Sequence, residues 1–250
     1  SETFNRLAFG DHPYGSVGDG TFETVAALTR DDMIAAHAAT LARDRIYVAA
    51  SGDITAAELG VLLDRLLGDL PATGAPLPGD ADWLLTGGTT VIDFPTPQST
   101  VLFGQIGLSR DDPDFFPAFV LNEALGGGRF TARLMSEIRE KRGLTYGIGT
   151  YLANMDHADM LMGQFSASND KVAEAITVLK AEWAKAATEG ITEEELAATK
   201  TYLTGSYPLR FNGNGPIASI LVGMQMDDMP IDYAVTRNDK INAVLDFYHV

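Results

Sequence analysis

The sequence of 250 residues contains no cysteine, which excludes disulfide bonds, cysteine-ligated zinc, iron–sulfur clusters and a thiol nucleophile. Basic residues are scarce: 18 Lys and Arg stand against 34 Asp and Glu, giving a formal net charge of −16. This charge repels nucleic acid and anionic lipid, so neither is expected as a partner. No apolar run approaches the ~18 residues that cross a bilayer, so no membrane insertion is expected either.

Zinc-binding motifs are also missing, since neither H-E-x-x-H nor H-x-x-E-H occurs in the chain. The four histidines are His12, His37, His157 and His249, and no two of them lie within one helical turn. A site built from distant His and Asp residues stays open, but no spacing favours it. His12, beside Pro13, is interpreted as a loop residue that makes hydrogen bonds. The sequence therefore predicts no metal site in this chain.

Glycine and serine motifs for other chemistries are absent as well. Gly15, Gly18 and Gly20 do not follow a strand, and Gly126–Gly128 are not followed by Lys-Ser or Lys-Thr, so nucleotide binding is not expected. No G-x-S-x-G nucleophile elbow is present. The acids of 111–114 and 193–195 could be calcium ligands or paired catalytic carboxylates, but each group stands at a predicted helix start, where acids stabilise the helix dipole.

The first 96 residues predict two capped helices, one short strand and a linker. Thr29 with Asp32, and Thr55 with Glu58, form capping boxes that begin helices running to about Leu41 and over 56–67. The apolar run at 46–50 predicts a strand covered on both faces. Prolines and glycines make residues 71–96 a predicted linker between two domains.

The rest of the chain predicts strands grouped with paired helices, which indicates an α+β fold with an antiparallel-rich sheet. The expected strands lie at 99–108, 144–153 and 159–168, and the expected helices at 115–125, around Leu134 and Ile138, from Val172 to Gly190, and after the Thr192 and Glu195 cap.

One segment, LGGGRFTARLMSEIREKRGLTYGIGTYLA at residues 125–153, is unusually specific. A glycine turn leads into a helix and a second turn into a strand, which places Arg139 near the helix end and Tyr146 near the strand start. A guanidinium suits a carbonyl or carboxylate, and a phenol can donate to a developing oxyanion. Composition alone favours a surface ion pair for Arg139 and a core position for Tyr146.

This segment resembles the signature of the pitrilysin/insulinase-like (inverzincin) zinc metallopeptidases, which reads from a glycine turn to R-x-x-x-G-L-x-Y. Further phrases resemble the family in the same order: HPYG, TRDD, SGDIT, PTPQ, GLSRDDPDF and GITEEELAATK. Together they cover most of residues 10–210, and the tail from Tyr207 resembles the bacterial subunit that lacks the zinc motif.

The resemblance implies two pitrilysin-like α/β domains, both truncated: residues 1–70 as the later part of a first domain, 71–96 as the linker, and 97–250 as the second domain. It also implies that Arg139 and Tyr146, with Gly127 and Gly128 of the glycine turn, bind a peptide substrate. Zinc is expected on a homologous partner subunit, or on a half of the protein missing here, and not in this chain.

The function implied is that of the substrate-binding part of a zinc metalloendopeptidase that degrades peptides inside a clamshell chamber, inactive alone because H-x-x-E-H is absent. The alternative is a non-catalytic scaffold or assembly subunit related to these peptidases. The resemblance favours the bacterial periplasm over the cytoplasm and leaves both open.

Overall fold

The structure, a computed structural model, describes residues 1–245; His249 lies outside them. The helices are α1 (Glu2–Phe9), η1 (Pro13–Gly15), α2 (Phe22–Ala27), α3 (Arg30–Thr40), η2 (Arg43–Arg45), α4 (Ala56–Leu67), α5 (Phe115–Leu125), η3 (Met135–Glu140), α6 (Val172–Glu189), α7 (Glu193–Ser206), η4 (Tyr207–Phe211), α8 (Asn214–Met226) and α9 (Tyr233–Ala243). The strands are β1 (Gln98–Ile106), β2 (Ile148–Met155) and β3 (Ala158–Ser168).

Contacts divide the chain into two compact units that interleave along the sequence. The sheet unit contains Ser1–Gly15, Asp80–Thr204 and the chain from Arg237 on; the helical unit contains Ser16–Gly79 and Gly205–Thr236. This grouping differs from the predicted order of 1–70, 71–96 and 97–250.

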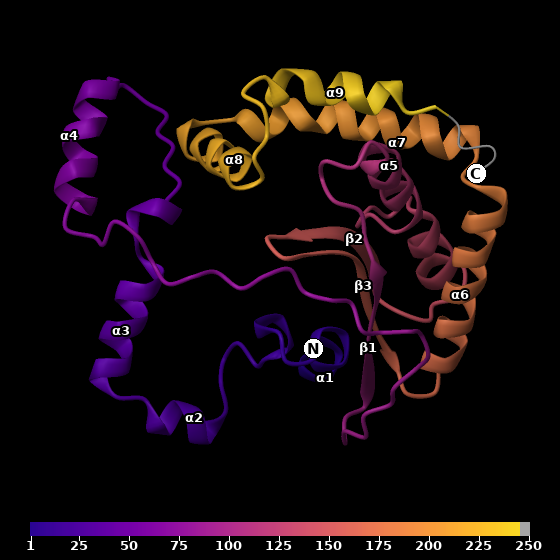
Figure 1. Cartoon of the computed structure of the whole chain (residues 1–250). Coiled ribbons are helices and arrows are strands. Elements are labelled where there is room, and N and C mark those ends of the chain that lie inside the picture. Colours follow the sequence, from indigo (N-terminus) through magenta and orange to yellow (C-terminus); the bar gives the residue numbers. More distant parts are fainter. Residues whose placement is uncertain (246–250) are drawn as a thin grey trace. The chain divides into compact units, whose positions relative to one another are not determined.

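The sheet unit is built on three antiparallel strands in the order β1-β3-β2 (Figure 1). Both pairings are in continuous register, with Phe103 opposite Gly163 and Gly163 opposite Thr150. Side chains alternate between the two faces, as a pleated strand requires. The cluster below one face includes Val101 and Phe165, and the cluster on the other includes Leu102 and Met162.

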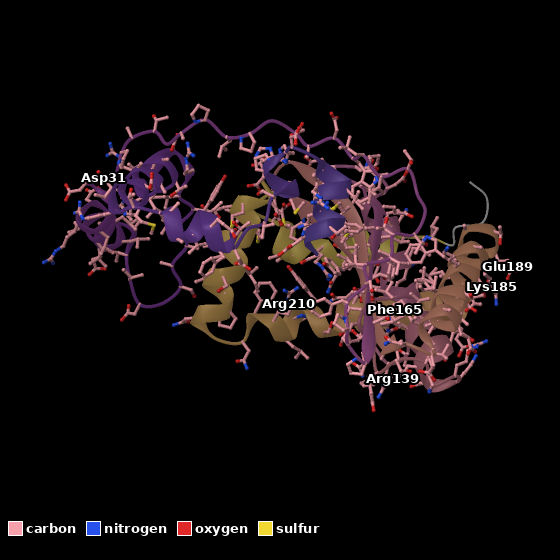
Figure 2. The ribbon with its side chains drawn as sticks, turned by 90° about the horizontal axis from the view of Figure 1, so that it is seen from below. Asp31, Arg139, Phe165, Lys185, Glu189 and Arg210 are labelled. Carbon is pink, nitrogen blue, oxygen red and sulfur yellow. The ribbon has the colours of Figure 1, made fainter. Side chains whose placement is uncertain are left out.

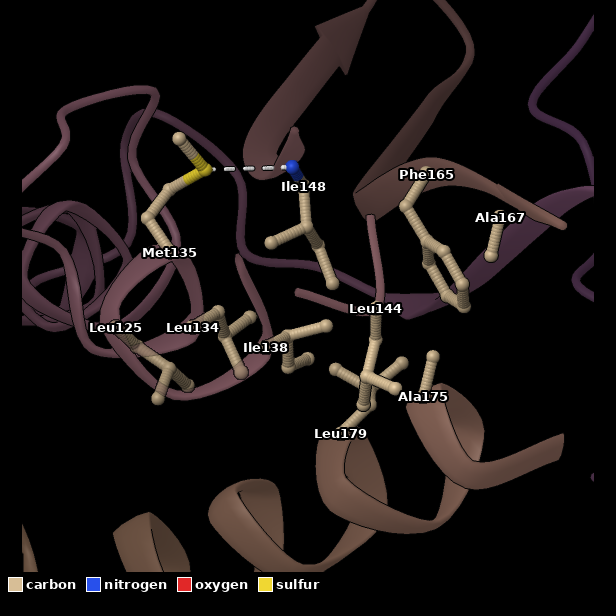
Figure 3. Packing of buried hydrophobic residues seen from close by; sticks show 10 residues of the cluster. All are labelled: Leu125, Leu134, Met135, Ile138, Leu144, Ile148, Phe165, Ala167, Ala175 and Leu179. Atoms are coloured by element: carbon tan, nitrogen blue, oxygen red, sulfur yellow. Dashed lines mark hydrogen bonds between the residues drawn. The ribbon is translucent and has the colours of Figure 1, made fainter. Parts of the chain in front are cut away.

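The first face carries the main core, in which α6 and η3 pack against the sheet. Its buried residues are Leu125, Leu134, Met135, Ile138, Leu144, Ile148, Phe165, Ala167, Ala175 and Leu179 (Figure 3). Leu134 and Ile138 have no exposed surface. Burying a side chain of that size contributes about 1.5–3 kcal/mol to folding, so this core fixes η3 against the sheet.

The second face is covered by α1, on the side of the sheet opposite to α6 (Figure 1). Phe4 and Phe9 of α1 each contact the ring of Trp83 edge to face, with centroids 6.0 and 5.8 Å apart. Leu84 donates its amide to the carbonyl of Ala8 at 2.9 Å. Part of the predicted linker is therefore packed structure of the sheet unit.

A third cluster joins α5, α7 and α9 through Val120, Leu196, Leu203, Ile241 and Val244. Among residues 1–245, no helix is long and apolar enough to cross a membrane.

The α+β class is confirmed, but the expectation of two pitrilysin-like domains is wrong: residues 1–245 form one α+β module whose strands make a single three-stranded sheet. The strand predicted at Ile46–Ala50 is not formed; this run is extended without strand pairing in the part of the chain that the structure describes. A strand needs a neighbour, and the apolar pattern alone does not supply one.

The helical unit confirms both predicted capping boxes. Thr29 exchanges hydrogen bonds with Asp32 at the start of α3, and Thr55 with Glu58 at the start of α4. Hydrogen bonds from Arg45 to the carbonyls of Ala39 and Ala75 hold the chain between and after these helices.

Candidate functional site

The glycine turn after α5 is held tightly against β2. The amides of Gly126 and Gly127 both donate to the carbonyl of Asn122, at 2.8 and 2.9 Å. Thr150 of β2 donates its amide to the carbonyl of Gly126 at 2.7 Å, and the Asn122 side-chain amide donates to the carbonyl of Thr150 at 3.2 Å. The turn therefore occupies the outer edge of β2 at this point.

The two glycines predicted to contact substrate have different surroundings. Gly127 is buried, and a Cβ there would lie 2.5 Å from the carboxyl carbon of Glu123, so packing alone requires glycine. Gly128 is exposed, and a Cβ there would meet no atom within 4 Å. Substrate contact by these glycines stays a prediction.

Two arginines after the turn are bound to α7. Arg129 donates to the Thr199 hydroxyl at 2.8 Å and stacks over the Tyr202 ring at 4.7 Å. Arg133 forms a bidentate ion pair with Glu195, at 2.8 and 2.5 Å, and donates to the carbonyl of Gly190. These contacts fix the backbone on both sides of Phe130.

Arg139 lies on η3, a π-helix in which the amide of Lys141 donates to the carbonyl of Ser136, five residues earlier. Its guanidinium carbon lies 4.6 Å from the centroid of the Phe130 ring. Within residues 1–245, Arg139 makes no side-chain hydrogen bond or ion pair. Figure 2 shows it at the margin of the sheet unit, away from Lys185 and Glu189 of α6.

Tyr146 stands outside the core because the residue before it is tied to the sheet. The Thr145 hydroxyl donates to the carbonyl of Ser166 at 2.6 Å, and Leu144 is buried in the main core. Tyr146 is 89% exposed. The amide of Gly143 donates to the carbonyl of Arg139 at 2.8 Å, so Arg139 and Tyr146 flank one tight turn.

Both interpretations based on composition alone are wrong. Arg139 has an aromatic partner in place of the expected ion pair among the described residues, and Tyr146 is exposed where a core position was expected. The other cations of η3 and the turn after it are occupied: Lys141 and Arg142 both bind the Glu137 carboxylate.

Hydrogen bonds favour the charged form of Glu137 and Glu195, whereas burial disfavours the charged form of Glu123. Hydrogen bonds from Lys141 and Arg142 hold the pKa of Glu137 below its ordinary value. Burial pushes the pKa of Glu195 upward, but hydrogen bonds from Arg133 and Thr192 outweigh burial, so this pKa is also lowered. Burial raises the pKa of Glu123 against the attraction of Arg129 and Arg237.

No group of three His, Cys, Asp or Glu side chains that could hold a metal ion occurs in residues 1–245, so these residues do not fit a catalytic zinc. The prediction for His12 is confirmed, because its Nδ1 accepts a hydrogen bond from the Tyr14 amide at 3.2 Å. The acid predicted to cap α7 is confirmed too: the Thr192 amide donates to Glu195 at 2.8 Å.

The sequence reasoning missed Phe130 and the two arginines that bind α7. One signal was available: Phe130 is a large apolar residue in a glycine-rich turn, a place where apolar side chains are seldom needed for packing. The distinction between Arg129, Arg133 and Arg139 had no sequence signal, since it depends on contacts with α7 residues that lie 70 and 62 positions away in sequence.

Comparison with known families gives a match to "Peptidase M16 inactive domain" over residues 27–203. An uncharacterised zinc protease of Streptomyces coelicolor is 28% identical over 262 residues, which cover 97% of this chain and 56% of the relative. One from Mycobacterium leprae is 31% identical over 209 residues, covering 82% of this chain and 46% of the relative. The chain spans about half the length of these curated relatives.

Solved structures of related proteins have the same fold. The crystal structure of a peptidase M16 inactive domain from Pseudomonas fluorescens has a TM-score of 0.81 at 25% identity, covering 98% of this chain and 58% of that one. A chain of complex III2 from Candida albicans has a TM-score of 0.75 at 16% identity, covering 97% and 60%, and shares the fold.

Proposed function

Because the chain belongs to the M16 peptidase family, matching its inactive domain, we propose that it is the peptide-binding, non-zinc-bearing part of a zinc metalloendopeptidase. In this proposal the chain lines one side of a chamber in which peptides are cut. The metal and the general base belong to a homologous zinc-bearing counterpart, since the residues described here do not fit a zinc site.

The observation that carries the proposal is the contrast within residues 125–153. Four cations of this segment, namely Arg129, Arg133, Lys141 and Arg142, have hydrogen bonds to protein groups. Arg139 has none among residues 1–245, and Tyr146, seven residues further along the chain, is exposed. Among residues 1–245, no hydrogen bond or ion pair uses the side-chain polar atoms of Arg139 or Tyr146, so these atoms are available to a ligand.

The chemistry of the pair suits a peptide. The guanidinium of Arg139 presents planar N–H donors to a peptide carbonyl or carboxylate. The phenol of Tyr146 can donate a hydrogen bond where negative charge develops on the scissile carbonyl oxygen. Arg139 therefore contributes to substrate binding, and Tyr146 contributes to the rate of the reaction.

The test is hydrolysis of a quenched fluorescent peptide by this chain alone, by the zinc-bearing counterpart alone, and by the two together. We expect turnover only when both are present, because neither carries the whole site. Zinc-dependent turnover by the isolated chain would contradict this division. Recovery of the chain in a native pull-down with a membrane complex, and with no metallopeptidase, would support the scaffold role instead.

A further inference from the structure

We propose that Phe130 is a positioning residue for Arg139: its ring holds the guanidinium in the orientation that binds peptide. The proposal rests on the proposed function, because it assigns Phe130 a role through Arg139. Phe130 is not among the substrate-binding residues predicted from the glycine turn and the R-x-x-x-G-L-x-Y signature.

The first step is the contact itself. The Arg139 guanidinium carbon lies 4.6 Å from the centroid of the Phe130 ring, within the range of a cation–π interaction. A stack on an aromatic face uses none of the guanidinium N–H donors. Arg139 is therefore held in place while its hydrogen-bonding capacity is left for a ligand.

The second step is the rigidity of the ring's support. Arg129, directly before Phe130, is bound to Thr199 and to the carbonyl of Glu123. Arg133, three residues later, is bound to Glu195. The backbone that carries Phe130 is thus attached to α5 and α7, which limits where its ring can lie.

The third step is exposure. Phe130 is 62% exposed, so the main core does not account for a phenylalanine at this position. The contact that the structure gives this ring is with the guanidinium of Arg139. An aliphatic residue of similar size would fold equally well but would lose the cation–π interaction.

The test compares peptide binding and turnover for Phe130→Leu, Phe130→Tyr and the unaltered chain, each combined with the zinc-bearing counterpart. Phe130→Leu keeps apolar bulk, and we expect KM to rise about two- to fivefold, the size of an exposed cation–π contact, with kcat nearly unchanged. Phe130→Tyr keeps an aromatic face, so its KM should equal that of the unaltered chain.

Arg139→Ala supplies the control that separates Phe130's action through Arg139 from direct contact with substrate. If Phe130 acts through Arg139, Phe130→Leu has no further effect in the Arg139→Ala background. An equal effect in both backgrounds would overturn the positioning role. If Arg139→Ala alone leaves KM and kcat unchanged, the proposed function fails, whatever the Phe130 variants do.

A second readout needs no activity. In the isolated chain, the ring current of Phe130 should shift the NMR signals of the Arg139 side chain upfield, and Phe130→Leu should remove this shift while Phe130→Tyr retains it. Arg139 signals that are the same in all three proteins would overturn the inference.

Discussion

At the scale of single residues, the contribution of a charged side chain to stability depends on its partners. Arg133 and Arg139, six residues apart, have different kinds of partner. Arg133 is largely buried and paired with Glu195 through two hydrogen bonds, whereas the Arg139 guanidinium lies over the Phe130 ring and makes no hydrogen bond or ion pair among residues 1–245. A buried charge without its partner is strongly destabilising, so Arg133 and Glu195 depend on one another for stability.

The Arg133–Glu195 pair makes stability depend on pH in the acidic range. The folded-state pKa of Glu195 lies below its ordinary value of 4.5, so its stabilising contribution is present above that value and is lost as pH falls through the folded pKa. We expect Glu195→Gln to lower the melting temperature at pH 7, and the difference from the unaltered chain to shrink as pH falls below 4.5.

Thermal melts at a series of pH values measure this effect, and Glu194→Gln is the matched control. Glu194 is exposed in the same first turn of α7. Its substitution should leave the pH profile close to that of the unaltered chain. Identical profiles for the two variants would contradict the role of the Arg133–Glu195 pair.

At the scale of elements, local sequence patterns predicted most helices and strands, whereas elements that depend on tertiary contacts could not be predicted. The helices at 56–67 and 115–125 are confirmed to the residue; the Thr55 and Glu58 capping box specifies the first, whereas the second begins after Asp114 without a side-chain cap. The three predicted strands are confirmed with shifted ends, since β2 begins at Ile148 and not at 144. The short connection between β2 and β3 accounts for the antiparallel pairing of these two strands.

Other elements could not be predicted from local sequence. The pattern of Leu134 and Ile138 predicted a helix, but the π form of η3 depends on fitting Met135 and Ile138 into the core below the sheet. The pattern at 46–50 contained no information on whether a neighbouring strand exists. Arg139 and Tyr146 were found through the family resemblance. Only the structure shows that Tyr146 is exposed and that the Arg139 side chain makes no hydrogen bond among residues 1–245.

The turn between η3 and β2 gives a prediction at this scale. Gly143 has φ +60°, a left-handed conformation that costs other residues about 1–2 kcal/mol. We expect Gly143→Ala to lower the melting temperature by about 2–8 °C, from the usual relation for a chain of this size.

Gly147→Ala is the matched control for that prediction. Gly147 lies in the same connection with an ordinary φ, and a Cβ there meets no atom within 4 Å. Its melting temperature should stay within about 1 °C of the unaltered chain. Equal losses for both glycines would show that the left-handed turn is not the cause.

At the scale of the whole molecule, Arg139 and Tyr146 belong to the sheet unit, and the helical unit has exposed apolar side chains. Large apolar side chains with exposed fractions above 55% include Phe22 of α2, Leu28 directly after α2, Met33 of α3, and Val61 and Leu66 of α4. The chain spans about half the length of the curated relatives that it matches.

Metal content is a direct prediction at this scale. Since residues 1–245 contain no group of three metal-binding side chains and the chain has no cysteine, we expect well below one zinc per chain after dialysis against a weak chelator. Elemental analysis measures this ratio. One tightly held zinc per chain would contradict the assignment of the metal to a counterpart.

The most direct measurement is kcat/KM for a quenched peptide in the reconstituted complex, compared between the unaltered chain and Tyr146→Phe. Tyr146 is 89% exposed, so the substitution should leave the melting temperature unchanged while removing one hydrogen-bond donor. Loss of one such donor to a developing oxyanion costs about 10²–10³ in kcat, so we expect a fall in kcat/KM of that size. An unchanged kcat/KM in a fully assembled complex would contradict the claim that this chain contributes chemistry to the site.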